Sequence, residues 1–182
     1  MEKLSELWGE PMILGSELSH RETGSVADLQ AIYDRHADNP ALGTELVSLM
    51  ADPELQKPAS WLLRRSLEAG QTLSVKEAQP LFHSLSGLVD WETRLQVLQS
   101  LPYLTIGKRD VKPLEAFLRD CLAGENKFVR AWAYHGFHEL ALQHDEFQAE
   151  VDQLLAQALE DEAASVKARV RNILQQKLKH RG

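Results

Sequence analysis

The feature that most constrains this chain is a helical spacing of apolar residues that recurs along its length. From an anchor residue, apolar or small residues return four, seven, eight and eleven positions later, which is the spacing of one face of an α-helix. The pattern starts at Ala59, Trp91, Val129 and Val166, so the anchors lie 32, 38 and 37 residues apart. In the clearest copy, the four positions after Val129 hold Ala133, Gly136, Phe137 and Leu140. Self-similarity at a period of about 20 to 50 residues indicates a tandem array of structural units.

Each of these helices follows another segment with an apolar stripe of its own, most clearly in residues 75–88, 111–122 and 147–159. Helix pairs of this length cannot bury both stripes alone, so neighbouring pairs must stack and share a core. No stretch alternates polar and apolar residues as an amphipathic strand does. The sequence therefore predicts one all-α domain, with about four helix pairs in residues 39–182 after an N-terminal segment and capping helix in residues 1–38.

Two motifs near the end of the chain resemble the HEAT repeat. The segment Val129–Phe137 is similar to the second helix of that repeat. Asp161 and Lys167 match its pattern of an aspartate between the helices that pairs with a basic residue early in the second helix. The aspartate position departs from the pattern in the other three pairs, where it holds Gly124, Ser86 and Glu54. The resemblance covers about residues 40–180 and implies a right-handed α-α superhelix, the armadillo-type solenoid.

Composition and the lone cysteine exclude several classes of protein. A chain of 182 residues buries enough surface to fold without disulfides, and Cys121, its single cysteine, cannot crosslink it internally. Charges interrupt the segment Met1–Trp8 before an apolar run of signal-peptide length develops. No segment reaches the run of about 20 apolar residues that spans a bilayer. These observations predict a cytoplasmic protein with no membrane segment.

The charge of the chain is unevenly distributed. A net charge of -7 argues against a general polyanion binder, because nucleic-acid affinity depends on contacts of Lys and Arg with phosphates. Residues 163–182 nevertheless hold six Lys or Arg residues and no carboxylate, which leaves 14 basic and 27 acidic residues elsewhere. We expect this basic final helix either to extend a binding site or to complement its own dipole.

The HEAT resemblance implies that the second helices line a concave surface. At 100° per residue, the first, fifth and ninth positions after each anchor are expected to point outward from the apolar stripe. This predicted ribbon consists of Ser60, Arg64, Glu68, Glu92, Gln96, Ser100, Arg130, Tyr134, His138, Lys167, Arg171 and Gln175. The partner contacts we expect from it are Arg64, Gln96, Arg130, Tyr134, His138, Lys167 and Arg171.

Two interpretations of this ribbon stay open. In one, Arg130 and Lys167 stabilise the repeat architecture and the other side chains form a solvated helix face. In the other, arginines act as forked donors to an acidic peptide, an acidic helix or a phosphate-bearing ligand, and Tyr134 is an amphipathic anchor.

Catalytic and metal-binding alternatives find less support. His135, His138 and Glu139 share one helix side, but there is no HExxH order and no converging ligand cluster, so we predict no metal and no cofactor. Nucleophile, phosphate-loop and dinucleotide motifs are absent, and we assign no catalytic residue.

The HEAT resemblance leaves two other functions open. Some HEAT-like solenoids are DNA glycosylases, whose chemistry needs a carboxylate about one turn from a tryptophan. Here Trp8, Trp61, Trp91 and Trp132 are followed four residues later by Met12, Arg65, Leu95 and Gly136. A bilin-lyase-like HEAT protein is a further alternative on which the sequence is silent. We therefore predict a protein-binding scaffold or adaptor, with nucleic-acid binding as the second choice and with the partner and oligomeric state left open.

Overall fold

The computed structural model of the protein describes residues 11–19 and 25–180. The segment Met1–Trp8, on which the absence of a signal peptide was predicted, lies outside these residues. The described part is helical with no strand, so the all-α prediction is confirmed. Its α-helices are α1 (Pro11–Ser19), α2 (Val26–His36), α3 (Leu42–Leu49), α4 (Gln56–Glu68), α5 (Val75–Ser84), α6 (Trp91–Ser100), α7 (Val111–Ala123), α8 (Lys127–Gln143), α9 (Gln148–Asp161) and α10 (Ala164–His180). Three 3-10 turns lie between them: η1 (Leu85–Gly87), η2 (Leu101–Tyr103) and η3 (Asp145–Phe147).

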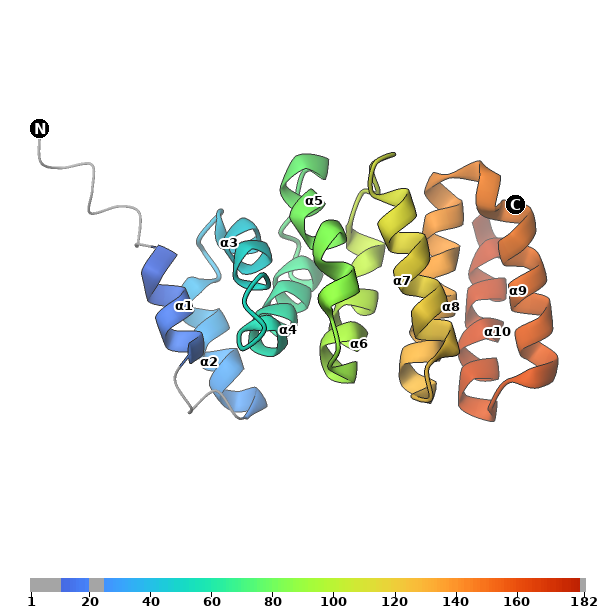
Figure 1. Ribbon diagram of the computed structural model, residues 1–182, viewed down its shortest axis with the longest axis horizontal. Coiled ribbons are helices and arrows are strands. Elements are labelled where there is room, and N and C mark those ends of the chain that lie inside the picture. The colour runs from blue at the N-terminus through green and yellow to red at the C-terminus, as the bar shows by residue number, and fades with distance from the viewer. Residues whose placement is uncertain (1–10, 20–24, 181–182) are drawn as a thin grey trace, which may run out of the picture.

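The helices lie in chain order from α1 at one end of the molecule to α9 and α10 at the other (Figure 1). Helices α4, α6, α8 and α10 contact one another in succession, and so do α3, α5 and α7. Helices close in sequence also pack together, as α3 does on α4, α7 on α8 and α9 on α10. Most side chains of the core therefore contact elements that are near in sequence, which is the packing that the recurring apolar stripes predict.

Side-chain caps fix where several helices begin. The Asn126 side chain accepts hydrogen bonds from the backbone N–H groups of Phe128 (2.9 Å) and Val129 (3.3 Å) at the start of α8. Ser74 and Glu77 form a reciprocal capping box at the start of α5. Gly70, with φ at 101°, follows α4 in the left-handed conformation that glycine adopts without strain.

The predicted stripes form the core. In α8 every residue of the pattern that starts at Val129 is buried, and in α10 Val166, Val170 and Ile173 are fully buried. The anchor Trp91 differs, because 44% of its surface is exposed at the first residue of α6. The apolar period therefore identified the buried faces of these helices, with an error at one helix end.

Helix α8 approaches its neighbours most closely at Gly136. A Cβ atom added there would lie 2.5 Å from Leu118 Cδ2 and 2.9 Å from Leu101 Cδ1. The missing side chain is therefore what lets α8 pack directly against α7 and η2.

Polar side chains connect one helix pair to the next. Gln143, the last residue of α8, accepts a hydrogen bond from the Ile106 N–H (2.8 Å) and donates one to the Leu104 carbonyl (3.1 Å). Ion pairs also join successive helix pairs: Lys57 with Glu92, Arg94 with Asp120, and Arg119 with Glu150. Among the described helices, none has both the length and the apolar character that a membrane crossing requires.

Candidate partner-binding groove

A groove of about 620 Å³ crosses the faces of four helices that contact one another in succession. Helix α8 contributes the largest share of its wall, five of the eleven lining residues, and α4, α6, η2 and α10 contribute the rest. The lining residues are Arg64, Glu68, Gln99, Pro102, Tyr103, Trp132, His135, His138, Glu139, Leu142 and Gln176. Tyr103 and Leu142 are exposed over 47% and 51% of their surface, so the groove presents apolar as well as polar contacts to solvent.

The α8 wall of the groove is a stacked and hydrogen-bonded row of side chains. The rings of Trp132 and His135 stack with their centroids 5.1 Å apart and their planes at 16°. His135 Nε2 lies 3.0 Å from Glu139 Oε1, and because an ionised carboxylate can only accept, the ring nitrogen donates. On α10, Arg169 Cζ lies 3.9 Å from the centroid of the Trp132 ring. Trp132 is thus held by an aromatic neighbour on its own helix and by a cation from the next pair.

His135 is a buried polar group of this row that bonds to a neighbouring carboxylate. It is 7% exposed, and its Nδ1 atom has no hydrogen-bond partner among the described residues. Because Nε2 is bonded to Glu139, Nδ1 is the ring nitrogen left without a partner in the described part of the chain. We infer that His135 serves mainly as a flat ring against which Trp132 packs.

Two of the predicted contacts are bonded to each other: Arg64, which lines the groove, and Gln96, which does not. Arg64 Nε donates to Gln96 Oε1 and its Nη1 donates to Glu68 Oε1, each over 2.5 Å. The first bond joins α4 to α6 across 32 residues of sequence. Arg64 therefore has its charge matched within the molecule while it lines the groove.

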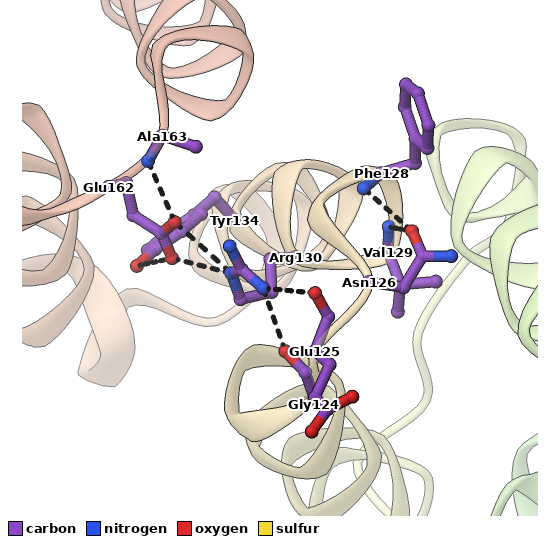
Figure 2. A network of polar contacts seen from close by, with 9 residues as sticks. All are labelled: Gly124, Glu125, Asn126, Phe128, Val129, Arg130, Tyr134, Glu162 and Ala163. Carbon is purple, nitrogen blue, oxygen red and sulfur yellow. Dashed lines mark hydrogen bonds and ion pairs between the residues drawn. The ribbon is translucent and has the colours of Figure 1, made fainter.

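Arg130 and Tyr134 belong to a separate polar network at the start of α8, which Figure 2 shows. Arg130 Nε donates to both Glu162 oxygens (3.0 and 3.2 Å), and its Nη1 donates to the carbonyls of Gly124 (3.0 Å) and Glu125 (2.8 Å). The Tyr134 hydroxyl also donates to Glu162, over 3.4 Å. Burial, reinforced by the Glu162 carboxylate, raises the pKa of Tyr134 to about 12. This network ties α8 to the turn between α9 and α10.

The outward orientation expected for the whole ribbon is wrong at four positions. The structure buries Ser60, Ser100, Tyr134 and His138. The physical reason is that the second helix of the following helix pair packs on this side, as α6 packs on α4 and α10 packs on α8. Ser60, Ser100 and Tyr134 therefore lie in the seams between neighbouring helices, whereas His138 is buried in the wall of the groove.

The two predicted contacts on α10 differ from each other. Lys167 donates from Nζ to the Glu160 carbonyl (2.8 Å), so it does not make the ion pair with Asp161 that the HEAT pattern suggests. Arg171 is exposed and makes no hydrogen bond or ion pair within the described part of the chain. Lys177 pairs with Asp152, and the side chains of Lys179, His180 and Arg181 lie outside the described residues.

Sequence reasoning missed most of the groove. The overlooked signal is a second stripe on α8, which carries Phe128, Trp132, His135, Glu139 and Leu142 at alternating spacings of four and three. Such a stripe marks one helix face, and two of its members, Phe128 and Leu142, are more than half exposed.

The groove is lined by aromatic rings and by side chains that can form hydrogen bonds. Among the described residues, no three His, Cys, Asp or Glu side chains are placed to hold a metal ion. Burial raises the pKa of the Cys121 thiol to about 12, so the thiolate that a nucleophile requires is scarce near neutral pH. No protein-family model matches the sequence, and comparison with curated proteins gives no match either.

Proposed function

We propose that this protein is a short HEAT-type solenoid that acts as a scaffold and binds a protein partner in the groove. One observation carries the proposal: the groove crosses four successive helices and combines exposed apolar side chains with polar groups. Tyr103 and the partly exposed Trp132 are of the types that contribute most at protein interfaces, and Leu142 adds exposed apolar surface.

The solenoid part of this proposal draws support from three features. The apolar anchors recur every 32 to 38 residues, and helices α4, α6, α8 and α10 contact each other in chain order. Side-chain bonds such as that between Arg64 and Gln96 link equivalent regions of successive pairs. Solenoids use extended surfaces of this kind for binding.

Tyr103 and Leu142 are better positions than Arg130 for variants that test the proposal. Arg130 is bonded to Glu162 and to two carbonyls, so reversing its charge would disturb the packing of α8. Tyr103 and Leu142 line the groove and are exposed, so polar substitutions there should leave the fold intact.

The experiment compares two double variants of the intact protein. Tyr103→Ser with Leu142→Ser changes the groove, whereas Val89→Ser with Leu178→Ser changes two exposed apolar residues that do not line it. A partner captured by the wild-type protein is produced pure, and its affinity is measured by calorimetry. We expect the groove variant to bind at least about tenfold more weakly and the control to bind as the wild type does. Equal affinity of both variants, with unchanged circular dichroism, would show that the groove is not the binding site.

A further inference from the structure

We propose that the groove recognises an acidic peptide segment through Arg169, which holds its guanidinium over Trp132 for a carboxylate of the partner. This inference rests on the proposed function and adds the chemistry of the partner. It concerns a residue outside the predicted ribbon, three positions after the anchor Val166. Trp132 stands at the equivalent position after Val129 in the preceding pair.

Arg169 differs from the other arginines that lie over aromatic rings in the described part of the chain. Arg65, Arg94 and Arg119 lie over rings and also donate hydrogen bonds to neighbouring side chains or carbonyls. Arg169 lies over Trp132 and makes no hydrogen bond or ion pair with any described residue. Its five N–H donors are therefore oriented by stacking while they remain available to a ligand.

The surroundings of Arg169 leave its charge unmatched. Helix α10 carries no carboxylate, since residues 163–182 contain six basic residues and no acidic one. The two carboxylates of the groove are already bonded, Glu68 to Arg64 and Glu139 to His135. Partial burial of Arg169, which lowers the pKa of its guanidinium from the usual value, makes an incoming anion a favourable partner.

A short acidic peptide fits this surface better than a polyanion does. Outside residues 163–182 the chain has 27 acidic and 14 basic residues, so a long polyanion would meet repulsion beyond the groove. A peptide needs to place only one carboxylate near Arg169. Tyr103 and Leu142 would then contact a bulky apolar residue of the same segment. The expected ligand therefore combines an acidic residue with a nearby aromatic or aliphatic one.

The test begins with selection of random twelve-residue peptides displayed on phage against the full chain. Selected peptides are synthesised, and their affinity is measured by fluorescence anisotropy against wild type, Arg169→Gln, Arg169→Lys and the control Lys112→Gln. Lys112 is an exposed cation on α7 that does not line the groove. We expect selected peptides to be rich in Asp and Glu, and Arg169→Gln to weaken their binding about tenfold or more.

Two further measurements have definite expected results: the affinity of the lysine variant and the dependence of binding on salt. Arg169→Lys should recover only part of the affinity, because lysine keeps the charge but loses the planar fork that stacks on Trp132. Binding should weaken as salt rises, and replacing the acidic residues of the peptide by their amides should reproduce the loss seen with Arg169→Gln. The control Lys112→Gln should bind as the wild type does.

Three outcomes would overturn the inference. Selected peptides without an acidic bias, whose binding falls with Tyr103→Ser and Leu142→Ser but not with Arg169→Gln, would remove the role of Arg169 and leave the proposed function standing. Failure to select any peptide would overturn the inference, and the partner measurements on the groove variant would still decide the proposed function separately. Tighter, Arg169-dependent binding of a single-stranded oligonucleotide would assign the site to nucleic acid instead.

Discussion

Gly136 shows at the scale of one residue how closely the helices pack. Alanine normally favours a helix over glycine by about 1 kcal/mol. At this position, however, the new methyl group would lie 2.5 Å from Leu118 and 2.9 Å from Leu101, and both leucines are fully buried. Overpacking of this kind costs up to about 3 kcal/mol, so the steric cost exceeds the gain in helix propensity.

We therefore expect Gly136→Ala to lower the free energy of unfolding by about 2 kcal/mol. Urea denaturation followed by circular dichroism measures this change. Gly87→Ala is the matched control, because a Cβ atom there meets nothing within 4 Å. A Gly136→Ala variant as stable as the wild type would show that the two leucines move aside without cost.

The protonation of Cys121 gives a second prediction at this scale. Burial raises the pKa of its thiol to about 12, so the folded state holds this proton to higher pH than the unfolded chain does. The contribution of the protonated thiol to the free energy of unfolding is thus fully present below the ordinary cysteine pKa, about 8.5. It is lost as pH rises toward 12. Tyr134, with its pKa raised to about 12, should act in the same direction above about pH 10.

We accordingly expect Cys121 to react with Ellman's reagent at pH 8 at least about a hundredfold more slowly in the native protein than in urea. The unfolding midpoint in urea should also fall as pH is raised from about 9 to 11. Rapid labelling of the native thiol would contradict the buried position of Cys121.

Between elements, the pair Arg130–Glu162 is the clearest polar connection. The Arg130 side chain is 20% exposed and that of Glu162 is 13% exposed, so removal of either partner leaves a charge that water reaches poorly. We expect Arg130→Met or Glu162→Met alone to destabilise the protein by about 2 to 3 kcal/mol. The double variant should cost clearly less than the sum of the single changes, as measured by a double-mutant cycle in urea. Strict additivity would mean that the two side chains do not interact.

Periodicity along the sequence predicts the buried face of a helix but not its neighbours in space. The stripe from Val129 to Leu140 identified the buried face of α8 because apolar residues recur at the helical period. Of the predicted partner contacts only Arg64 and His138 line the groove, since the period does not reveal from which side the helix of the next pair packs. Tyr134 is buried away from the groove, whereas Trp132, which was not among the predicted contacts, lines it. The contact of Arg169 with Trp132 joins two pairs and has no local signal at all.

For the whole molecule, the packing predicts an uneven resistance to local opening. Helix α8 contacts α6, α7, α9 and α10, and ten of its 17 residues are buried. Helix α2 has three buried residues among 11. Hydrogen exchange read by mass spectrometry should therefore find the slowest amides in α8, with α2 exchanging at least about tenfold faster. Equal protection of α2 and α8 would contradict a stability centred on α8.

Gln143 has a consequence for the order in which the chain can take its final form. Its side-chain amide offers one acceptor and one donor, to Ile106 and Leu104, as a peptide group of a neighbouring strand would. The segment that connects η2 to α7 is therefore fixed by a residue that follows Ile106 by 37 positions in the sequence. During synthesis on the ribosome this crossing cannot be locked until α8 has emerged, so the middle of the protein should mature later than its position in the chain suggests.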